Sequence, residues 1–343
     1  MRIKPSILVT AIIGSFTISS AFAADPQVAT VATGDGVFNI RLGAAYVNMD
    51  VANGFGTVVD ESDFTFITQP DNGAGISAVG GELSGDYWGP GLGLGGIYLG
   101  ASILKVSDDN NSVLALPTTG PFPFLDTLPI DGSPSHGAIT AGPGAQANVS
   151  VDADFHRLAA SAGYALPTQT AGTNVALGLY GAYSQLNFDA ATKPVGGGGF
   201  ANLSEDVNVA SVGPMVAFQK TVPLTETVEG FIEGQVALLY ARGNFDATQS
   251  ASNISGISLS SHEGDIAGMA EGRAGVSVLA FGGGKLSLFG GLGVRNDVYK
   301  IVNPRSEPGL VASNAASYHP GPATIQQTIQ YSVSVGAKFA IQF

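Results

Sequence analysis

Eight charged residues lie in segments where apolar and polar side chains alternate, each on the polar side of its segment. Charges that share a narrow interior either line a water-filled passage and set its ion preference, or pair with one another across it. Pairing stays open as the alternative, because an unpaired interior charge costs free energy. We predict a pore lining or interior charge network made of Arg41, Arg157, Glu233, Glu271, Arg273, Arg295, Asp297 and Lys338.

Glycines on the same polar side bear on this choice. Gly43, Gly163, Gly291 and Gly293 would leave interior volume unfilled, which favours a passage. Where backbones approach closely, the same glycines would instead relieve crowding. We favour the passage, and the second reading stays open.

The histidines form no recognisable catalytic group. His156 and His262 are each flanked by two carboxylates, but neither reproduces the His-x-Ser pattern of a lipid deacylase. Asp108 and Asp109 could touch a divalent cation, although a solvated loop tip is the simpler interpretation. We therefore predict that the protein is not an enzyme and has no cofactor and no metal site.

The elements that must position these residues are clearest at the end of the chain. From Ile325 to Phe343 almost every second side chain is apolar or aromatic. Successive side chains of a strand point to opposite faces, so one face is apolar and the other polar. This alternation runs far beyond the ~5 to 6 residues of an average strand. Tyr331 and Phe343 share the apolar face and would lie roughly 30 Å apart in height, near two membrane interfaces.

This terminal segment resembles the closing strand of Gram-negative outer-membrane β-barrel proteins, which typically ends in Phe after alternating apolar residues. The resemblance implies recognition by the barrel-assembly machinery. The assembly signal would consist of Tyr331, Phe339, Ile341 and Phe343.

The start of the chain has the layout of a cleaved signal peptide. Arg2 and Lys4 form a basic start, an apolar run covers 7–18, and 21–23 offers a small-x-small site. An uncleaved anchor is the alternative, but the run is short of the ~18 to 20 apolar residues of a spanning helix. We expect a signal peptide at 1–23, a periplasmic leader at 24–35 and a single barrel domain at 36–343.

Composition narrows the class further. Hydrophobic residues make up 45% of the chain, yet no later stretch has the length of an apolar helical span. Backbone groups in lipid must all be hydrogen-bonded, which leaves a closed barrel as the way to cross. Loss of the signal peptide would change 14 basic and 27 acidic residues to 12 and 27, a balance of −15. This acidity argues against a nucleic-acid partner, and the absence of cysteine excludes a disulfide framework.

The whole pattern predicts an all-β protein, a transmembrane antiparallel up-and-down β-barrel of about ten strands, with eight or twelve as alternatives. Short turns at 167–172, 222–227 and 282–285 would face the periplasm, and the long loops would face outward. The stretch 105–146, which is rich in proline, should be a loop. A soluble sandwich or β-solenoid is the alternative. The expected strands are 37–49, 75–83, 88–104, 151–166, 173–188, 206–219, 228–245, 265–281, 286–301 and 325–343.

Residues 207–243 also resemble the paired-strand signatures of the Legionella-type pore-forming outer-membrane proteins. The residues that carry this resemblance are Ser211–Met215, Phe231 and Ala237–Gly243. That family implies a pore-forming, porin-like barrel.

We therefore expect a protein of the cell outer membrane that forms a passive, cation-preferring pore for small hydrophilic solutes. The alternative is a closed barrel whose extracellular loops carry a structural, adhesive or host-surface role. Expected partners are outer-membrane lipid and lipopolysaccharide, the export and barrel-assembly machinery, and small hydrophilic solutes. Acidic residues would concentrate cations at the outer mouth, namely Asp60, Glu61, Asp63, Asp71, Asp108, Asp109, Asp126 and Asp131.

Overall fold

The computed structural model describes residues 36–52, 57–60, 66–68, 74–90, 95–115, 123–127, 130–132, 137–139, 146–168, 170–195, 199–252, 254–279, 284–303 and 322–342. The predicted signal peptide 1–23, the leader 24–35 and Phe343 lie outside this part of the chain. Among the described residues, no helix has the length and apolar character needed to cross a membrane.

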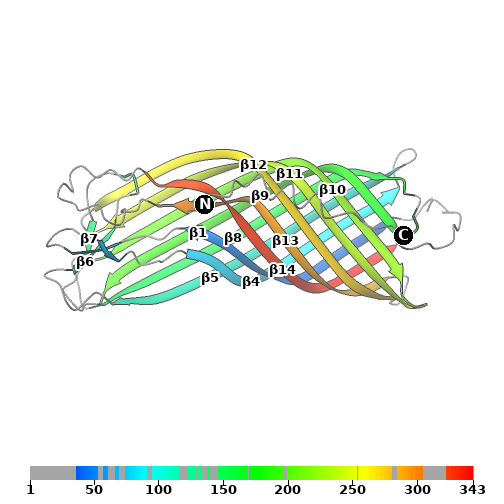
Figure 1. Ribbon diagram of the computed structural model, residues 1–343, viewed down its shortest axis with the longest axis horizontal. Helices are drawn as coiled ribbons and strands as arrows, with labels where there is room; N and C mark the ends of the chain where they lie inside the picture. The colour runs from blue at the N-terminus through cyan, green and yellow to red at the C-terminus, as the bar shows by residue number, and fades with distance from the viewer. Residues whose placement is uncertain are drawn as a thin grey trace.

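Ten long strands form one closed barrel, which confirms the predicted fold class and strand number (Figure 1). Neighbouring strands are antiparallel, and β1 closes the wall by pairing with β14 on one side and β4 on the other. The wall consists of β1 (Val37–Ala52), β4 (Ala74–Pro90), β5 (Gly96–Ala115), β8 (Gln146–Leu166), β9 (Thr173–Pro194), β10 (Ala201–Pro223), β11 (Val228–Ala251), β12 (Ile254–Leu279), β13 (Lys285–Val302) and β14 (Thr324–Gln342).

The two ends of the barrel differ. The turn end carries four short connections, together with the start of β1 and the end of β14, where Val37 pairs with Gln342. The loop end carries the three long connections, the shorter connections 195–200 and 252–253, and a small separate sheet (Figure 1). No alternation in the sequence predicted this sheet, whose order is β3 (Phe66–Thr68), β2 (Thr57–Asp60), β6 (Pro123–Thr127) and β7 (Gly137–Ile139).

The apolar face and the polar face of each wall strand change sides along its length. On β8, Leu158 and Tyr164 point outward and are 56% and 46% exposed, and Arg157 points inward. Toward the loop end the order reverses, because Phe155 lies inside and Asp154 outside. We call the apolar outer portion the membrane band, since exposed apolar side chains around a barrel suit lipid. Beyond it the outer face is polar and the inner face is apolar.

This reversal explains why the strands are longer than predicted. The prediction that 105–146 is a loop is wrong for its first part, because β5 continues to Ala115 and pairs with β8 as far as Gln146. Polar side chains there face water instead of lipid, so the outward apolar alternation ends although the strand continues. The boundary at 88 is also wrong, since Trp88 belongs to β4.

Part of the wall turns inward at the loop end. Ladder pairing between β12 and β13 stops at Met269 and Arg295, and an irregularity follows between Arg295 and Val298. Beyond that point, residues 296–303 at the end of β13 and 322–327 at the start of β14 leave the wall and pack inside the barrel. We call these two segments the inner hairpin. Ile325, predicted on the outer apolar face, is 3% exposed inside the barrel for this reason.

Candidate functional site

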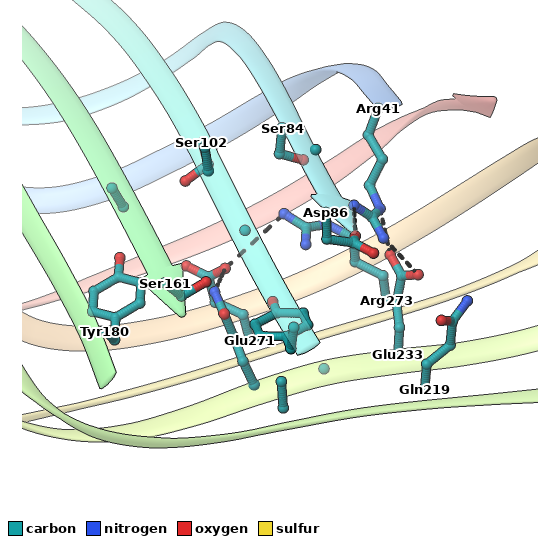
Figure 2. Close-up of a pocket in the computed structure, with 18 of the residues that line it drawn as sticks. Arg41, Ser84, Asp86, Ser102, Ser161, Tyr180, Gln219, Glu233, Glu271 and Arg273 are labelled. Carbon is teal, nitrogen blue, oxygen red and sulfur yellow. Dashed lines mark hydrogen bonds and ion pairs between the residues drawn. The ribbon is translucent and has the colours of Figure 1, made fainter. Parts of the chain in front are cut away.

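The structure places all eight predicted charged residues inside the barrel, in a layer at the level of the membrane band. Figure 2 shows part of this layer, with Arg41, Glu233, Glu271 and Arg273 labelled. Glu82 and Asp86 of β4 join them. The sequence signal for these two was present, because Glu82, Ser84 and Asp86 alternate along one face. It was missed because the glycines of β4 left the outer face without an apolar series.

Arg41 of β1 organises the first group of this layer. Its guanidinium forms an ion pair with Asp86 and a bidentate pair with Glu233, at 2.6 Å from Nε to Oε1 and 2.9 Å from Nη2 to Oε2. Lys338 Nζ donates to Glu233 Oε2 at 3.0 Å, and Asn39 Nδ2 donates to Asp86 Oδ1 at 2.7 Å. All the charged groups of this cluster are compensated.

Glu271 of β12 is the centre of the second group. Its carboxylate lies 3.6 Å from guanidinium nitrogens of both Arg157 and Arg295, and 4.0 Å from Arg273. Arg273 also pairs with Glu82. One carboxylate on β12 is therefore shared by three arginines from three strands.

Asp297 completes the layer. It forms two 2.5 Å contacts with Arg295 and accepts a 2.7 Å hydrogen bond from Ser211 Oγ. Arg295 also lies over the ring of Tyr180, 5.9 Å from its centroid. Planar guanidinium groups suit such bidentate and stacked arrangements.

The layer is electrically balanced. It contains five cations, Arg41, Arg157, Arg273, Arg295 and Lys338, and five carboxylates, Glu82, Asp86, Glu233, Glu271 and Asp297. Every one of the ten takes part in at least one ion pair. A charge layer without net charge gives an ion of either sign no advantage at this level.

Little open space remains within the layer. A cavity of about 60 Å³ lies between Arg41, Ser84, Tyr180, Glu233 and Arg273 (Figure 2). A second cavity of about 120 Å³ lies toward the turn end, beside Asn39, Lys285 and Lys338. Both are polar and roomy enough for ordered water, which needs roughly 10 to 15 Å³ per molecule.

The lumen beyond the layer is apolar and largely filled. Phe155, Phe188, Phe245 and Tyr299 of four different strands are among the most completely buried side chains of the described residues, each at most 2% exposed. The inner hairpin supplies part of this packing, because Tyr299 Oη donates to the carbonyl of Ala241 at 3.2 Å. These side chains and the inner hairpin together fill much of the lumen between the charge layer and the loop end.

One carboxyl is buried within this apolar region. Glu205 of β10 is fully buried, and its Oε2 accepts a 3.2 Å hydrogen bond from Asn303 Nδ2 of the inner hairpin. Its Oε1 has no hydrogen-bond partner among the described residues. Burial raises the pKa of Glu205 to about 8.

The interior glycines fit the crowding interpretation. A Cβ on Gly163 would lie 2.7 Å from the carbonyl oxygen of Leu177, and one on Gly43 would lie 2.7 Å from that of Val335. Gly291 and Gly293 would meet the hydroxyls of Ser334 and Ser332 at 2.7 and 2.5 Å. Gly43 and Gly163 therefore permit close contact between neighbouring strands, and Gly291 and Gly293 make room for serine hydroxyls.

The remaining chemical candidates lie outside the lumen. His156 is on the outer face of β8, and His262 is exposed on β12. Asp108 accepts a 2.8 Å hydrogen bond from the backbone of Ser77, so it belongs to a strand and not to a loop tip. Asp109 lies directly opposite Asp152, and both like charges and burial raise the pKa of Asp152, with burial the larger cause.

Comparison with known proteins gives only solved structures of low similarity. No family model and no curated protein sequence matches the chain. Among solved structures, the outer membrane protease OmpT of Escherichia coli has 11% identity and a TM-score of 0.40, covering 93% of this chain and 100% of that one. The toluene transporter TodX of Pseudomonas putida has 9% identity, a TM-score of 0.29 and 91% coverage of each. A Pseudomonas aeruginosa FadL homologue has 5% identity, a TM-score of 0.26 and 90% coverage of each.

The closed ten-stranded wall and its apolar band define the class of protein: the fold is that of an outer-membrane β-barrel. The resemblance of 207–243 to the Legionella-type proteins stays a prediction, because no comparison shows that family.

Proposed function

We propose that this protein is an outer-membrane β-barrel closed to hydrophilic solutes, whose loop end stands above the membrane and carries a structural, adhesive or host-surface role. The observation that supports closure best is the lumen itself. All ten charges of the layer are paired, and the apolar core with the inner hairpin fills much of the space beyond them.

The height of the wall supports a surface role. β11 has 24 residues and β12 has 26, which corresponds to roughly 60 Å of height at the usual rise and tilt of barrel strands. The apolar band of such barrels is only about 25 Å tall. More than half of these two strands would therefore stand outside lipid. By the usual orientation, the turn end faces the periplasm and the loop end faces outward.

A passive pore is the second candidate. It is favoured by the polar cavities within and below the charge layer, which water can enter from the turn end. The balanced layer does not support a cation preference, so any such preference would have to come from the acidic loops. We further propose that the protein is not an enzyme.

Single-channel recording in planar bilayers separates the two candidates. We expect wild-type protein to give no conductance steps. A variant without residues 298–325 that also carries Arg41→Ser and Glu233→Ser should conduct, and it serves as the control for insertion. Regular conductance steps from the wild type would contradict the closed-barrel proposal. Cation-selective steps would establish the pore.

The orientation of the barrel can be tested by labelling single cysteines on intact cells. The chain has no cysteine of its own, so only the introduced residue reacts. Ser260→Cys on the loop-end part of β12 should react with a membrane-impermeant thiol reagent. Thr225→Cys in a turn-end connection should react only after the outer membrane is opened. The reverse pattern would contradict the proposed orientation.

A further inference from the structure

The inward turn of the inner hairpin leaves part of β12 without a ladder partner on one side, among the residues that the structure describes. β12 pairs with β11 along almost its whole length, from Val278 to Ile254. On its other side it pairs with β13 only from Leu279 to Met269. Within the described residues, the stretch 254–268 is therefore an edge of the wall, as is 106–115 of β5 on its β4 side.

Two hydrogen bonds identify the backbone groups that face the open side. The carbonyl of Ile266 accepts from Gln327 Nε2 at 3.2 Å, and the amide of Gly268 donates to Asn296 Oδ1 at 2.6 Å. Side chains of the inner hairpin, and not the backbone of a neighbouring strand, form these two hydrogen bonds. Because alternate residues of a strand point their backbone groups to the same side, the even-numbered residues from 256 to 264 present theirs to the opening.

This part of the edge is exposed on its outer face. Gly256, Ser258, Ser260, His262 and Gly264 are all exposed. Proteins usually protect edge strands with lysine, proline, a bulge, inward-pointing charges or a covering segment. The stretch 254–268 contains neither lysine nor proline. Its last exposed apolar residue on the outer face is Ile266, so the stretch 256–264 lies above the membrane band.

Two carboxylates flank the same edge. Glu263 and Asp265 are exposed and lie two residues apart, on the phase of β12 that faces the lumen. They pair with Ala241 and Gly243 of β11, the two positions that Tyr299 of the inner hairpin contacts. Neither forms an ion pair within the part of the chain that the structure describes.

We propose that the edge of β12 from Gly256 to Gly264 binds an extended basic peptide as an additional strand. Main-chain hydrogen bonds to the even-numbered residues would supply affinity, as in other cases of strand addition. Lysine or arginine side chains two residues apart on the peptide would meet Glu263 and Asp265, and this pairing would set the register. The proposal deepens the surface role above and rests on it, since the edge must face the cell exterior.

The experiment uses the full mature chain in lipid nanodiscs and a fluorescein-labelled ten-residue peptide in which lysine alternates with threonine. Fluorescence anisotropy should show saturable binding. N-methylation of alternate peptide amides, which removes the donors for the edge without changing charge, should weaken binding at least tenfold. A peptide of the same composition with its lysines adjacent should also bind at least fivefold more weakly.

Protein variants test the two halves of the site separately. Glu263→Gln with Asp265→Asn should weaken binding about tenfold, whereas Asp152→Asn with Asp189→Asn, on the outer face of β8 and β9, should leave it unchanged. Ser260→Pro should also abolish binding, because it removes an amide on the open side while β11 pairing remains. Heat-modified mobility on gels checks that each variant is folded.

Binding that survives N-methylation and loss of both carboxylates would show nonspecific attraction and overturn the proposal, as would no binding at all. Efficient spontaneous cross-linking of Gly264→Cys with Lys300→Cys would show that β13 itself occupies the edge, and would also overturn it. If wild-type protein conducts while the peptide binds as expected, the closed barrel fails and the edge site stands.

Discussion

Arg41 of β1 and Glu233 of β11 join opposite sides of the barrel wall through one bidentate ion pair, with Nε and Oε1 2.6 Å apart. The two strands are four places apart in a ring of ten. Both side chains are less than 10% exposed. Such a pair fixes the distance between walls that share no ladder hydrogen bonds, and it blocks the lumen at the level of the membrane band.

Loss of Glu233 should be among the most damaging single changes in the barrel. Glu233→Gln leaves Arg41 with Asp86 alone and Lys338 without its carboxylate, so we expect a loss of about 3 to 5 kcal/mol in the free energy of unfolding. Urea unfolding in liposomes, followed by the fluorescence of the single tryptophan Trp88, measures it. Glu226→Gln in an exposed turn is the control. A loss below about 1 kcal/mol would show that the layer is solvated.

Phe245 tests the apolar core at the loop end. It is fully buried, and Phe245→Ala should lower the free energy of unfolding by about 3 to 5 kcal/mol through lost burial and the remaining cavity. Leu288→Ala on the lipid-facing side, where the side chain is 72% exposed, should change it far less. Equal effects of both substitutions would contradict a packed lumen.

Gly163 tests close approach of the wall strands. Gly163→Ala places a methyl group 2.7 Å from the carbonyl oxygen of Leu177 and 3.1 Å from Gly178 Cα, so β8 and β9 must separate. We expect a loss of about 1 to 3 kcal/mol, measured by the same urea titration. Gly272→Ala meets nothing within 4 Å and should be tolerated. An unchanged Gly163→Ala variant would favour the open-volume interpretation of these glycines.

Glu205 should make stability depend on pH. Its pKa is about 8 in the folded chain, against an ordinary value of 4.5. Between these values the folded state keeps a proton that the unfolded state has lost, so the free energy of unfolding falls as pH rises, by about 1.4 kcal/mol per unit. The stabilisation is complete below pH 4.5 and is gone above pH 8. Urea titrations at pH 5 and pH 8.5 should show this slope in wild type and a flatter one in Glu205→Gln.

The charge layer shows how far sequence alone can reach. Eight of its ten members could be assigned to the interior because they alternate with apolar residues of the membrane band, as Arg41 does between Ile40 and Leu42. Which cation meets which carboxylate could not be assigned, since Arg41 and Glu233 are 192 positions apart. The strand order and the curvature of the closed wall decide that pairing.

The alternation of Ile325–Phe343 and its counterparts determined that the chain forms an all-β barrel with a polar interior, because lipid and strand geometry together impose a period of two. Alternation of apolar and polar residues does not indicate where a strand separates from its neighbour in the sheet. The split between Met269 and Arg295, the inner hairpin, and the largely filled lumen therefore came only from the tertiary structure. There, apolar side chains such as Tyr299 and Ile325 gain burial by packing inside the barrel, and the exposed edge of β12 is the consequence.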